Sequence, residues 1–294
     1  MSFSITQSAI SNMISSSLDA DSAQLATLQQ QLSSGQNITE PSQDPAGLVE
    51  SLSLTSQLNR ANQYSTNATD GLIVAKMADA TLSNAVNALQ QARTTLVAAG
   101  GPGITASSAS GLIGSLKAAY ASLMGLANTS YMGQAIFAGT SGASTAYDAS
   151  GNYAGSLSSS TRTVAPGFRA AVAVTAPFGQ SGAADNMFSA LSQAITDLSS
   201  GNYGAVDSAD LTKFDQAMSG VLQSAASQGA MVEQLTYMQT QSTQTSQDLQ
   251  TQLGAIQNLD MPALTTQYSE AMNNYQVALQ VASTAVQPTL AKYL

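Results

Sequence analysis

Residues 32–48 read LSSGQNITEPSQDPAGL and combine a helix end, a turn and a helix start. Gly35 follows a stretch in which apolar residues recur at helical spacing, and glycine readily takes the left-handed conformation that closes a helix. Pro41 favours a turn. Asp44 followed by Pro45 is typical of a helix start, with aspartate as the cap and proline in the first turn. This stretch therefore predicts a loop between a helix that ends at the glycine and a helix that begins at the second proline.

Apolar residues near both ends of the chain recur in alternating steps of three and four. This spacing is typical of the contact seam of a coiled coil. Asp21 takes the one polar position of the first seam, and Ala271, Ala278, Ala282 and Ala285 belong to the second. The residues that we expect to form an assembly interface are Ile14, Leu18, Leu25, Leu28 and Leu32, and then Leu264, Tyr268, Tyr275 and Leu279.

The two terminal segments carry few charges. No Lys or Arg occurs before Arg60 or between Lys213 and Lys292, so ion pairs along the helix cannot support these segments. An isolated helix of about 25 residues with so thin an apolar seam is marginal in water. The same spacing also occurs in ordinary helical bundles, which is the alternative interpretation. We expect these ends to become ordered only against partner helices.

The middle of the chain alternates between helical and β-type patterns. Helical spacing runs from Pro45 to a Gly-Gly-Pro-Gly stop at 100–103, and a further helix is predicted for 106–131. Short alternating runs between turn signals predict a β-rich insert over 136–182. Later helical stretches begin near Ala184, resume at Ser208 after a break at 199–202, and start again at Pro262.

This order of elements predicts a mainly α fold with a small β-rich insert. We expect a long antiparallel helical hairpin or coiled coil, in which the N- and C-terminal helices pair and a β-domain lies at the distal end. The expected division is an N-terminal assembly helix and loop (1–44), a helical-bundle domain in two parts (45–133 and 184–260), a β-rich outer domain (134–183) and a C-terminal assembly helix (261–294).

The composition excludes several classes of function. Of 294 residues, 8 are basic and 17 are acidic, which gives a net charge of −9. Such a chain lacks the clustered Lys and Arg that bind nucleic acid or an anionic membrane surface. It has no His and no Cys, so it lacks imidazole and thiolate metal ligands and the usual general base. We therefore expect no enzyme, no catalytic residue, no metal and no cofactor.

Other local signals are weak. The nearest carboxylate pairs, Asp19 with Asp21 and Asp207 with Asp210, are expected to be solvated acids near helix starts. The N-terminus has no positively charged, apolar leader, and no stretch approaches about 18 apolar residues. We expect neither a cleavable secretory signal nor a membrane span.

The segment quoted first resembles the signature at the end of the first helix in the bacterial flagellin family. Its Pro-Ser-x-Asp-Pro-Ala part is similar to the hook-associated branch of that family. Gln36, Asn37 and Gln43 replace charged residues that are usual in the signature, so we expect hydrogen bonds in place of an electrostatic contact. The matching residues are Ser33, Ser34, Gly35, Pro41, Asp44, Pro45, Ala46 and Gly47.

A second match lies in the run Ile-Phe-Ala-Gly-Thr, which contains Phe137, Gly139 and Thr140. It is similar to the start of the outer β-domain in the same branch, and the C-terminal residues 275–294 are similar to the ending of that branch. The resemblance implies a non-enzymatic building block of the bacterial flagellum that joins the hook to the filament.

The same resemblance implies how the chain reaches its place and what it contacts. It would be exported unfolded through the flagellar type III apparatus, with the help of an export chaperone, and would remain outside the cell. Its expected partners are hook-associated protein 1, flagellin and further copies of itself in a ring. Neither nucleic acid nor membrane insertion is expected.

Two alternatives stay open. The first is filament flagellin, although the run that contains Phe137 and the Lys-Tyr-Leu ending both disfavour it. The second is a carbohydrate-binding or adhesive protein of the cell surface. Its stacking residues would be Tyr147, Tyr153, Phe168 and Phe178, although these side chains also suit the core of a small insert.

Overall fold

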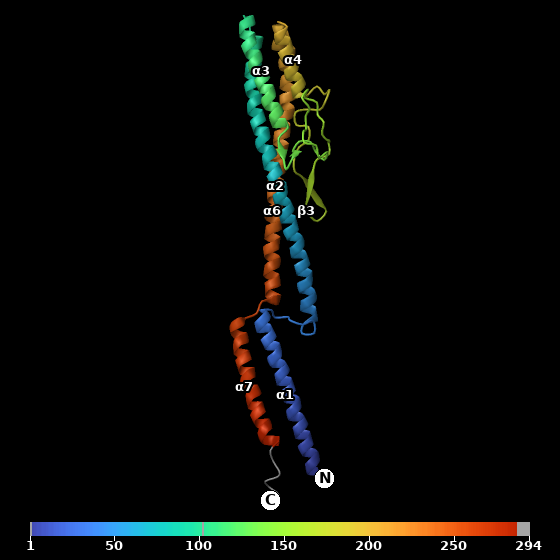
Figure 1. Cartoon of the computed structure of the whole chain (residues 1–294), viewed down its shortest axis with the longest axis vertical. Helices are drawn as coiled ribbons and strands as arrows, with labels where there is room; N and C mark the ends of the chain where they lie inside the picture. Colours follow the sequence, from blue (N-terminus) through green and yellow to red (C-terminus); the bar gives the residue numbers. More distant parts are fainter. Residues whose placement is uncertain (1, 102, 287–294) are drawn as a thin grey trace. The chain divides into compact units, whose positions relative to one another are not determined.

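The computed structural model describes residues 2–101 and 103–286 (Figure 1). The chain divides into two compact units. The terminal unit consists of residues 1–59 and 246–294, and the central unit consists of residues 60–245. Most of the described regular structure is helical, which confirms the predicted mainly α fold with a small β-rich insert.

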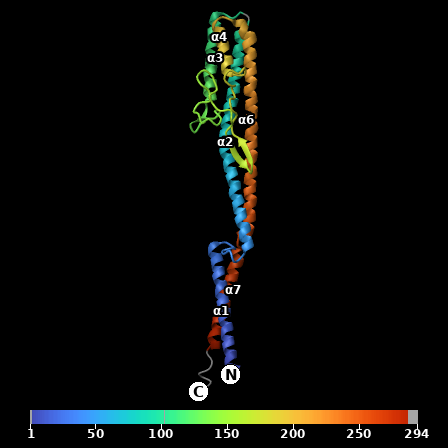
Figure 2. The ribbon, with the colours of Figure 1, turned by 90° about the vertical axis from the view of Figure 1, so that its right-hand side faces the viewer.

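The terminal unit contains α1 (Ser2–Ser34) and α7 (Met261–Val286), which lie side by side and antiparallel (Figures 1 and 2). The predicted pairing of the N- and C-terminal helices is confirmed. Asp260 caps α7, because its Oδ1 accepts a hydrogen bond from the Ala263 N–H at 3.2 Å. Pro262 follows in the first turn, where backbone N–H groups have no acceptor within the helix, so the missing N–H of proline costs nothing.

Two further helices begin and end close to glycine, proline and capping residues. α2 (Pro45–Gly100) has the predicted start and end. α3 (Ala106–Ala127) also starts as predicted, after Thr105, whose Oγ1 accepts a hydrogen bond from the Ser108 N–H at 3.2 Å. The predicted end of this second helix at Tyr131 is wrong.

Helix α3 ends early because Asn128 turns its side chain toward the insert. Asn128 Oδ1 accepts hydrogen bonds from the N–H groups of Ala146 and Tyr147 at 2.8 and 2.9 Å. Its Nδ2 donates to the Tyr147 carbonyl at 3.0 Å. Side-chain bonds of this kind compete with the helical backbone pattern. Residues far along the chain therefore decide where α3 stops.

In the central unit, α2 runs antiparallel to α6 (Leu211–Gln257), as the two views in Figures 1 and 2 show. The hydroxyls of Ser65 and Thr243 lie 3.3 Å apart, and at the other end Arg93 donates two hydrogen bonds to Asp215 at 2.7 and 2.9 Å. The hydrogen bond from Arg93 holds the pKa of Asp215 below its usual value. Exposed ion pairs add little stability, so apolar packing holds these helices together.

The fourth helix, α4 (Met187–Ser199), packs on α3. It starts after Asn186 instead of at the predicted Ala184, because Asn186 Oδ1 accepts the Ser189 N–H at 2.8 Å. The predicted break that follows α4 is confirmed. It leads into the short helix α5 (Tyr203–Ala205), the π-helical turn η1 (Val206–Asp210) and then α6.

The β-rich insert contains two antiparallel two-stranded sheets. β1 (Ser130–Tyr131) pairs with β2 (Gln134–Ala135), and β3 (Thr161–Ala165) pairs with β4 (Phe168–Ala171). A bulge follows Thr163. The remainder of the insert consists of turns, so the strands are shorter than the alternating pattern predicts.

One face of the β3–β4 hairpin packs on the long helices. Val164 of β3 is buried with Leu72 of α2 and Leu235 of α6. Asn67 Nδ2 donates to the Thr163 carbonyl at 2.8 Å. Within the central unit, the insert therefore lies along the side of α2 and α6 (Figure 1), and not at the distal turn that the order of elements predicts. The reason is that α3 runs back along the unit from this turn before the insert begins.

A buried glutamine joins the insert to both long helices. Gln228 of α6 is fully buried. Its Nε2 donates to the carbonyls of Ala75 in α2 and Val172 in the insert at 3.0 and 3.2 Å, and its Oε1 accepts the Val174 N–H at 3.0 Å. Each polar atom of this amide thus has a partner, as burial requires.

Aromatic side chains fill the core between the insert and α4. Tyr147, Phe178 and Phe188 are buried, and the Phe188 ring centre lies 5.2 Å from that of Tyr147 and 5.4 Å from that of Tyr120. The Tyr147 hydroxyl donates to the Gly179 carbonyl at 3.1 Å, and burial raises the pKa of Tyr147 well above its usual value. Because they are buried, Tyr147 and Phe178 are not available to stack on a sugar.

Candidate assembly interface

The predicted seam residues lie where α1 and α7 meet. Leu28 and Leu264 are buried. Asp21, Ala271 and Ala278 lie on the same two stripes and are half-buried. The face that the spacing marks on each helix is therefore the face that meets the other helix. The remaining half-buried members are Ile14, Leu18, Leu25, Leu32, Tyr268 and Tyr275.

Leu279 lies outside this seam. Its side chain is 44% exposed, and the neighbouring Ala278 takes the seam position. Val277, which is 60% exposed, lies on the other side of that alanine. A role of Leu279 in assembly therefore requires contact with another molecule, and it stays a prediction.

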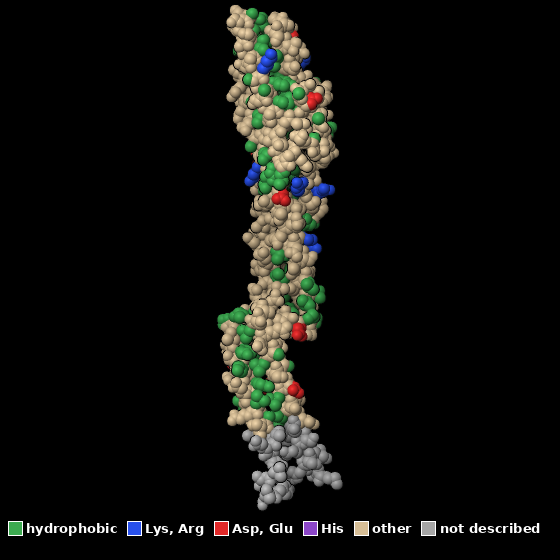
Figure 3. All heavy atoms as spheres, viewed as in Figure 1, with side chains coloured by type: hydrophobic (Ala, Val, Ile, Leu, Met, Phe, Trp, Pro, Cys, Tyr) green, Lys and Arg blue, Asp and Glu red, His purple; other side chains and the backbone are tan. Residues whose placement is uncertain are grey.

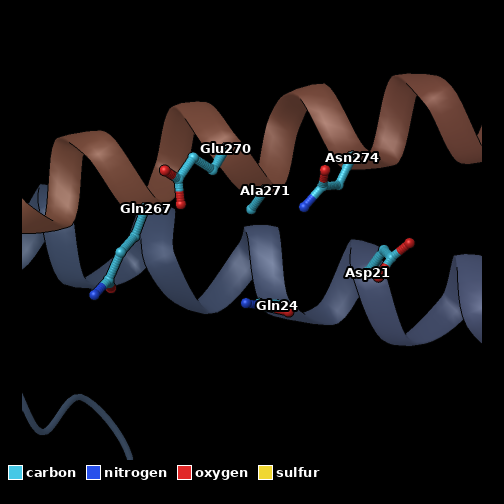
Figure 4. A pocket seen from close by; sticks show the side chains of 6 residues that line it. All are labelled: Asp21, Gln24, Gln267, Glu270, Ala271 and Asn274. Carbon is cyan, nitrogen blue, oxygen red and sulfur yellow. The ribbon is translucent and has the colours of Figure 1, made fainter.

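Polar side chains interrupt the seam and gather between the two helices (Figure 4). Asp21 takes a position where an apolar residue would add contact area, and Ala271 leaves space between the helices. Polar or charged residues in a seam reduce stability and specify register or partner. The cavity here has a volume of about 150 Å³ and is lined by Asp21, Gln24, Gln267, Glu270, Ala271 and Asn274.

Hydrogen bonds between uncharged groups hold the loop that follows α1 in place. Gly35 has a φ of +69°, the left-handed conformation that its sequence position predicts. Gln31 Nε2 donates to the Asn37 carbonyl at 2.8 Å, and the Asn37 N–H donates to the Gln257 carbonyl at 3.0 Å. The side chain of Gln257 also donates to Ser51 of α2. Hydrogen bonds between uncharged groups thus order this loop, as its amide residues predict.

Gln43 and Asp44 order the second half of the loop. Gln43 Oε1 accepts hydrogen bonds from the N–H and the hydroxyl of Thr39 at 3.0 and 3.1 Å. Asp44 Oδ1 accepts the Gly47 N–H at 2.8 Å, which is the predicted cap of α2. The other residues of the family signature, Ser33, Ser34, Pro41 and Ala46, are exposed, and their role in assembly stays a prediction.

Replacing Gly47 with alanine is expected to loosen the start of α2. A Cβ atom on Gly47 would collide with the Asp44 carboxylate and would lie 2.9 Å from Ile38 Cδ1. Loss of this cap costs about 1–2 kcal/mol of local stability. Hydrogen–deuterium exchange over residues 44–52 should therefore become faster in G47A.

Gly111→Ala is the matched control, because nothing lies within 4 Å of a Cβ atom at that helical position. This variant should gain about 0.5–1 kcal/mol from the better helix former. Unchanged protection at residues 44–52 in G47A would show that the cap does not order the loop.

The predicted start of the outer domain forms a tight turn in the core of the insert. Phe137 is buried, and Gly139 has a φ of +65° with no room for a Cβ atom beside the Ser156 carbonyl. The Thr140 N–H donates to the Ser158 carbonyl at 3.0 Å. These residues thus hold residues 137–140 against residues 156–158 of the insert.

A pair of carboxyl groups lies between α4 and η1, and one of the two is buried. Asp210 is only 2% exposed, and no described group donates to its Oδ2. Its neighbour Asp197 accepts hydrogen bonds from Gln193 at 2.8 Å and Asn202 at 3.2 Å, which lower the pKa of Asp197. Burial and the charge of Asp197 raise the pKa of Asp210, against a weaker opposite effect of Lys213. The expected solvation of Asp210 is therefore wrong, and its main neighbour is Asp197.

Asp210→Asn is expected to stabilise the protein at neutral pH. The raised pKa means that the native state binds a proton that the unfolded state releases above its own pKa of about 3.9. This contribution to stability is complete below that pH and is lost as the pH rises through the raised pKa of Asp210. An asparagine cannot ionise and supplies a permanent donor, so D210N should gain about 1–2 kcal/mol at pH 7.

Urea denaturation between pH 3 and pH 8 measures this effect. The D210N curve should diverge from that of the natural chain only as the pH rises. Asp207 is exposed, so D207N should keep the natural pH profile. A D210N variant that is less stable than the natural chain at pH 7 would contradict the view that an ionised Asp210 destabilises the native state.

Metal-binding clusters and membrane-spanning helices are absent from the described residues. Over residues 2–101 and 103–286, no three Asp, Glu, His or Cys side chains come together in a way that could hold a metal ion. Over the same residues, no helix has a stretch both long and apolar enough for a bilayer.

Sequence reasoning missed the polar residues beside Asp21. The spacing of apolar residues does not identify the polar residues that flank the seam, which are Gln24, Gln267 and Asn274. Glu270 did have a signal, because it is the one charged residue in the sequence of α7. A charge that stands alone in an otherwise neutral helix indicates a position where the helix meets something polar.

Comparisons with known proteins agree with this architecture. Residues 5–142 match the family model of the bacterial flagellin N-terminal helical region. No curated protein matches the sequence. Solved structures from Vibrio parahaemolyticus, Bacillus cereus and Legionella pneumophila are among those that share the fold.

The Vibrio structure is that of a flagellar hook-associated protein, with a TM-score of 0.67 and 22% identity over 74% of this chain and 100% of that chain. FlgL of Bacillus cereus has a TM-score of 0.59 and 18% identity over 69% of this chain and 99% of its own. Flagellar hook-associated protein 3 of Legionella pneumophila has a TM-score of 0.59 and 15% identity, with coverages of 69% and 98%. Residues 5–142 are thus similar to the N-terminal helical region of bacterial flagellins, and the chain shares its fold with these solved flagellar proteins.

Proposed function

We propose that this protein is a structural component of the bacterial flagellum that joins the hook to the filament. The observation that carries the proposal is the α1–α7 pair, a charge-poor helical pair with a half-buried seam, in a chain with the fold of hook-associated proteins. The role in this proposal is architectural, because the helix pair offers a surface for association.

The thin seam supports a role in assembly. Its members are mostly half-buried, and the half-buried positions include the alanines Ala271, Ala278 and Ala282, so each residue removes little apolar surface from water. Ordering the backbone costs about 1–2 kcal/mol per residue. The terminal unit therefore gains most of its stability when neighbouring subunits cover what remains exposed. Residues 1–44 and 261–294 would be the assembly segments, and 134–183 would be the outer domain.

The partners in this proposal are hook-associated protein 1 on one side and flagellin on the other, with further copies of the chain in a ring. An export chaperone and the flagellar type III apparatus would deliver the chain unfolded to the outside of the cell. The lack of cysteine and the low charge of the ends are compatible with passage through a narrow channel.

Deletion of the gene tests this function. A junction protein predicts intact hooks and flagellin shed into the medium. Re-expression of the chain should restore attached filaments. If the deletion instead removed the filament material itself, filament flagellin would be the function, an alternative that the general flagellin match over residues 5–142 also fits.

A further inference from the structure

The α1–α7 pair leaves an apolar groove on its surface. Ile14 and Leu18 of α1 and Val277 and Val281 of α7 form the apolar walls. The two valines are among the most exposed apolar side chains of α7. The groove has a volume of about 260 Å³ and is completed by Ser17, Asn274 and Ala278. Apolar walls of this kind receive the apolar side of a helix.

The apolar groove lies next to the polar cavity of Figure 4. Asn274 lines both, so the two are neighbours along the helix pair. Asp21 and Glu270 carry the only charges that line them. Along α7, Glu270 lies two helical turns from Val277, which is about 10 Å at 1.5 Å per residue. We call this combined surface the α1–α7 groove.

The negative charge of the groove has no basic counterpart among the described residues of the terminal unit. No Lys or Arg occurs among the described residues of that unit, and Lys292 is the one basic residue of its sequence. In the face that Figure 3 shows, acidic and no basic side chains appear over the described part of this unit. The acidic residues in the unit are Asp19, Asp21, Glu40, Asp44, Glu50, Asp248, Asp260 and Glu270.

We propose that the α1–α7 groove binds a basic amphipathic helix of a different protein. An apolar side chain of that helix would fill the groove between Leu18 and Val277. A Lys or Arg about seven residues away would reach Asp21 and Glu270. The inference rests on the proposed function in taking this protein to be another flagellar subunit.

Charge is the reason that the occupant is not a second copy of the same terminal helices. The α1 and α7 sequences contain acidic residues and no basic ones, so a second α1 or α7 in the groove would place like charges together. Like charges at an interface oppose association, while a basic side chain gains a charge-assisted hydrogen bond. The groove thus favours a partner of another sequence over self-association.

Photo-crosslinking in the living bacterium tests the proposal. Benzoylphenylalanine replaces Gln24, which lines the polar part of the groove, in the full-length chain. We expect the crosslinked peptide to come from another protein and to contain Lys or Arg within one helical turn of the linked residue. A crosslink to a peptide of this chain, including one with Lys292, or to a peptide without a basic residue would overturn the inference.

Charge variants test the mechanism. Removing both charges with D21N and E270Q should lower the crosslink yield about tenfold, whereas D19N and K292Q should change it less than about twofold. Circular dichroism shows whether each variant keeps its helix content. If the double variant folds but crosslinks as before, the charges do not recruit the partner. Reversal of the partner's basic residue to Glu should abolish the crosslink, and D21K in the same cells should restore it.

The two proposals fail in different ways. Immunoblots of isolated hook–filament structures show whether the chain is present in flagella, which tests the proposed function. The crosslinked peptide is identified from whole cells and medium, so the partner's chemistry is tested in either case. If the crosslinked peptide is a basic helix of a non-flagellar protein, the proposal for the α1–α7 groove is supported and the proposed role at the hook–filament junction is contradicted.

Discussion

Removal of residues 1–33 or of residues 262–294 is expected to leave a soluble, folded chain that no longer joins a filament. Each deletion removes one helix of the α1–α7 pair, so the seam and the groove cannot form. The central unit keeps its own core, in which Leu82, Leu89 and Phe214 are fully buried. Its melting temperature by circular dichroism should shift by less than about 3 °C, which corresponds to about 1 kcal/mol for a unit of this size.

Incorporation into filaments is measured by immunoblot of sheared flagella. Met132→Ala is a suitable control, because this side chain in the central unit is 87% exposed, and the variant should assemble normally. Normal assembly of either deleted chain would contradict the role of the terminal helices. The same conclusion would follow if limited proteolysis of the lone protein found both ends fully protected.

Phe188→Ala is expected to cause the largest loss of stability by a single substitution. The ring is fully buried and packs against Tyr120, Tyr147 and Phe178, with ring centres 5.2–5.7 Å away. Truncation of a buried phenylalanine costs about 3–5 kcal/mol, because apolar contact is lost and a cavity remains. The free energy of unfolding, measured by urea titration with tyrosine fluorescence, should fall by this amount.

Phe188→Leu separates volume from aromatic contact. Leucine keeps most of the apolar volume, so F188L should lose about half as much stability as F188A. Both variants should retain the α1–α7 pair, because Phe188 lies in the central unit. A loss below about 1 kcal/mol in F188A would mean that the aromatic cluster does not hold the insert on α4.

Local chemistry made the helix boundaries of this chain predictable. Asp44 and Pro45 start α2, Gly35 ends the helix before it, and Pro262 lies in the first turn of α7. Each of these signals acts within a few residues, through a fixed φ, a missing donor or a short side-chain bond. The seam of α1 and α7 was predictable for the same reason, since helical geometry alone determines which residues share a face.

Two of the predictions that were wrong depend on contacts between residues far apart in the chain. The end of α3 depends on Asn128, whose partners Ala146 and Tyr147 lie in the insert. Asp210 is buried because the chain returns it to Asp197 on another helix. The sequence near Asn128 and near Asp210 contains no pattern that predicts these contacts.

The sequence by itself determined that the chain is mainly helical, where most helices begin and end, and which faces of its two terminal helices are apolar. Only the tertiary structure decided that the insert lies along α2 and α6, that Gln228 is fully buried there, and that Asp21 and Glu270 share one groove. Spacing and capping act through neighbours in the chain, whereas burial and pairing depend on which distant segments meet and leave room for each other.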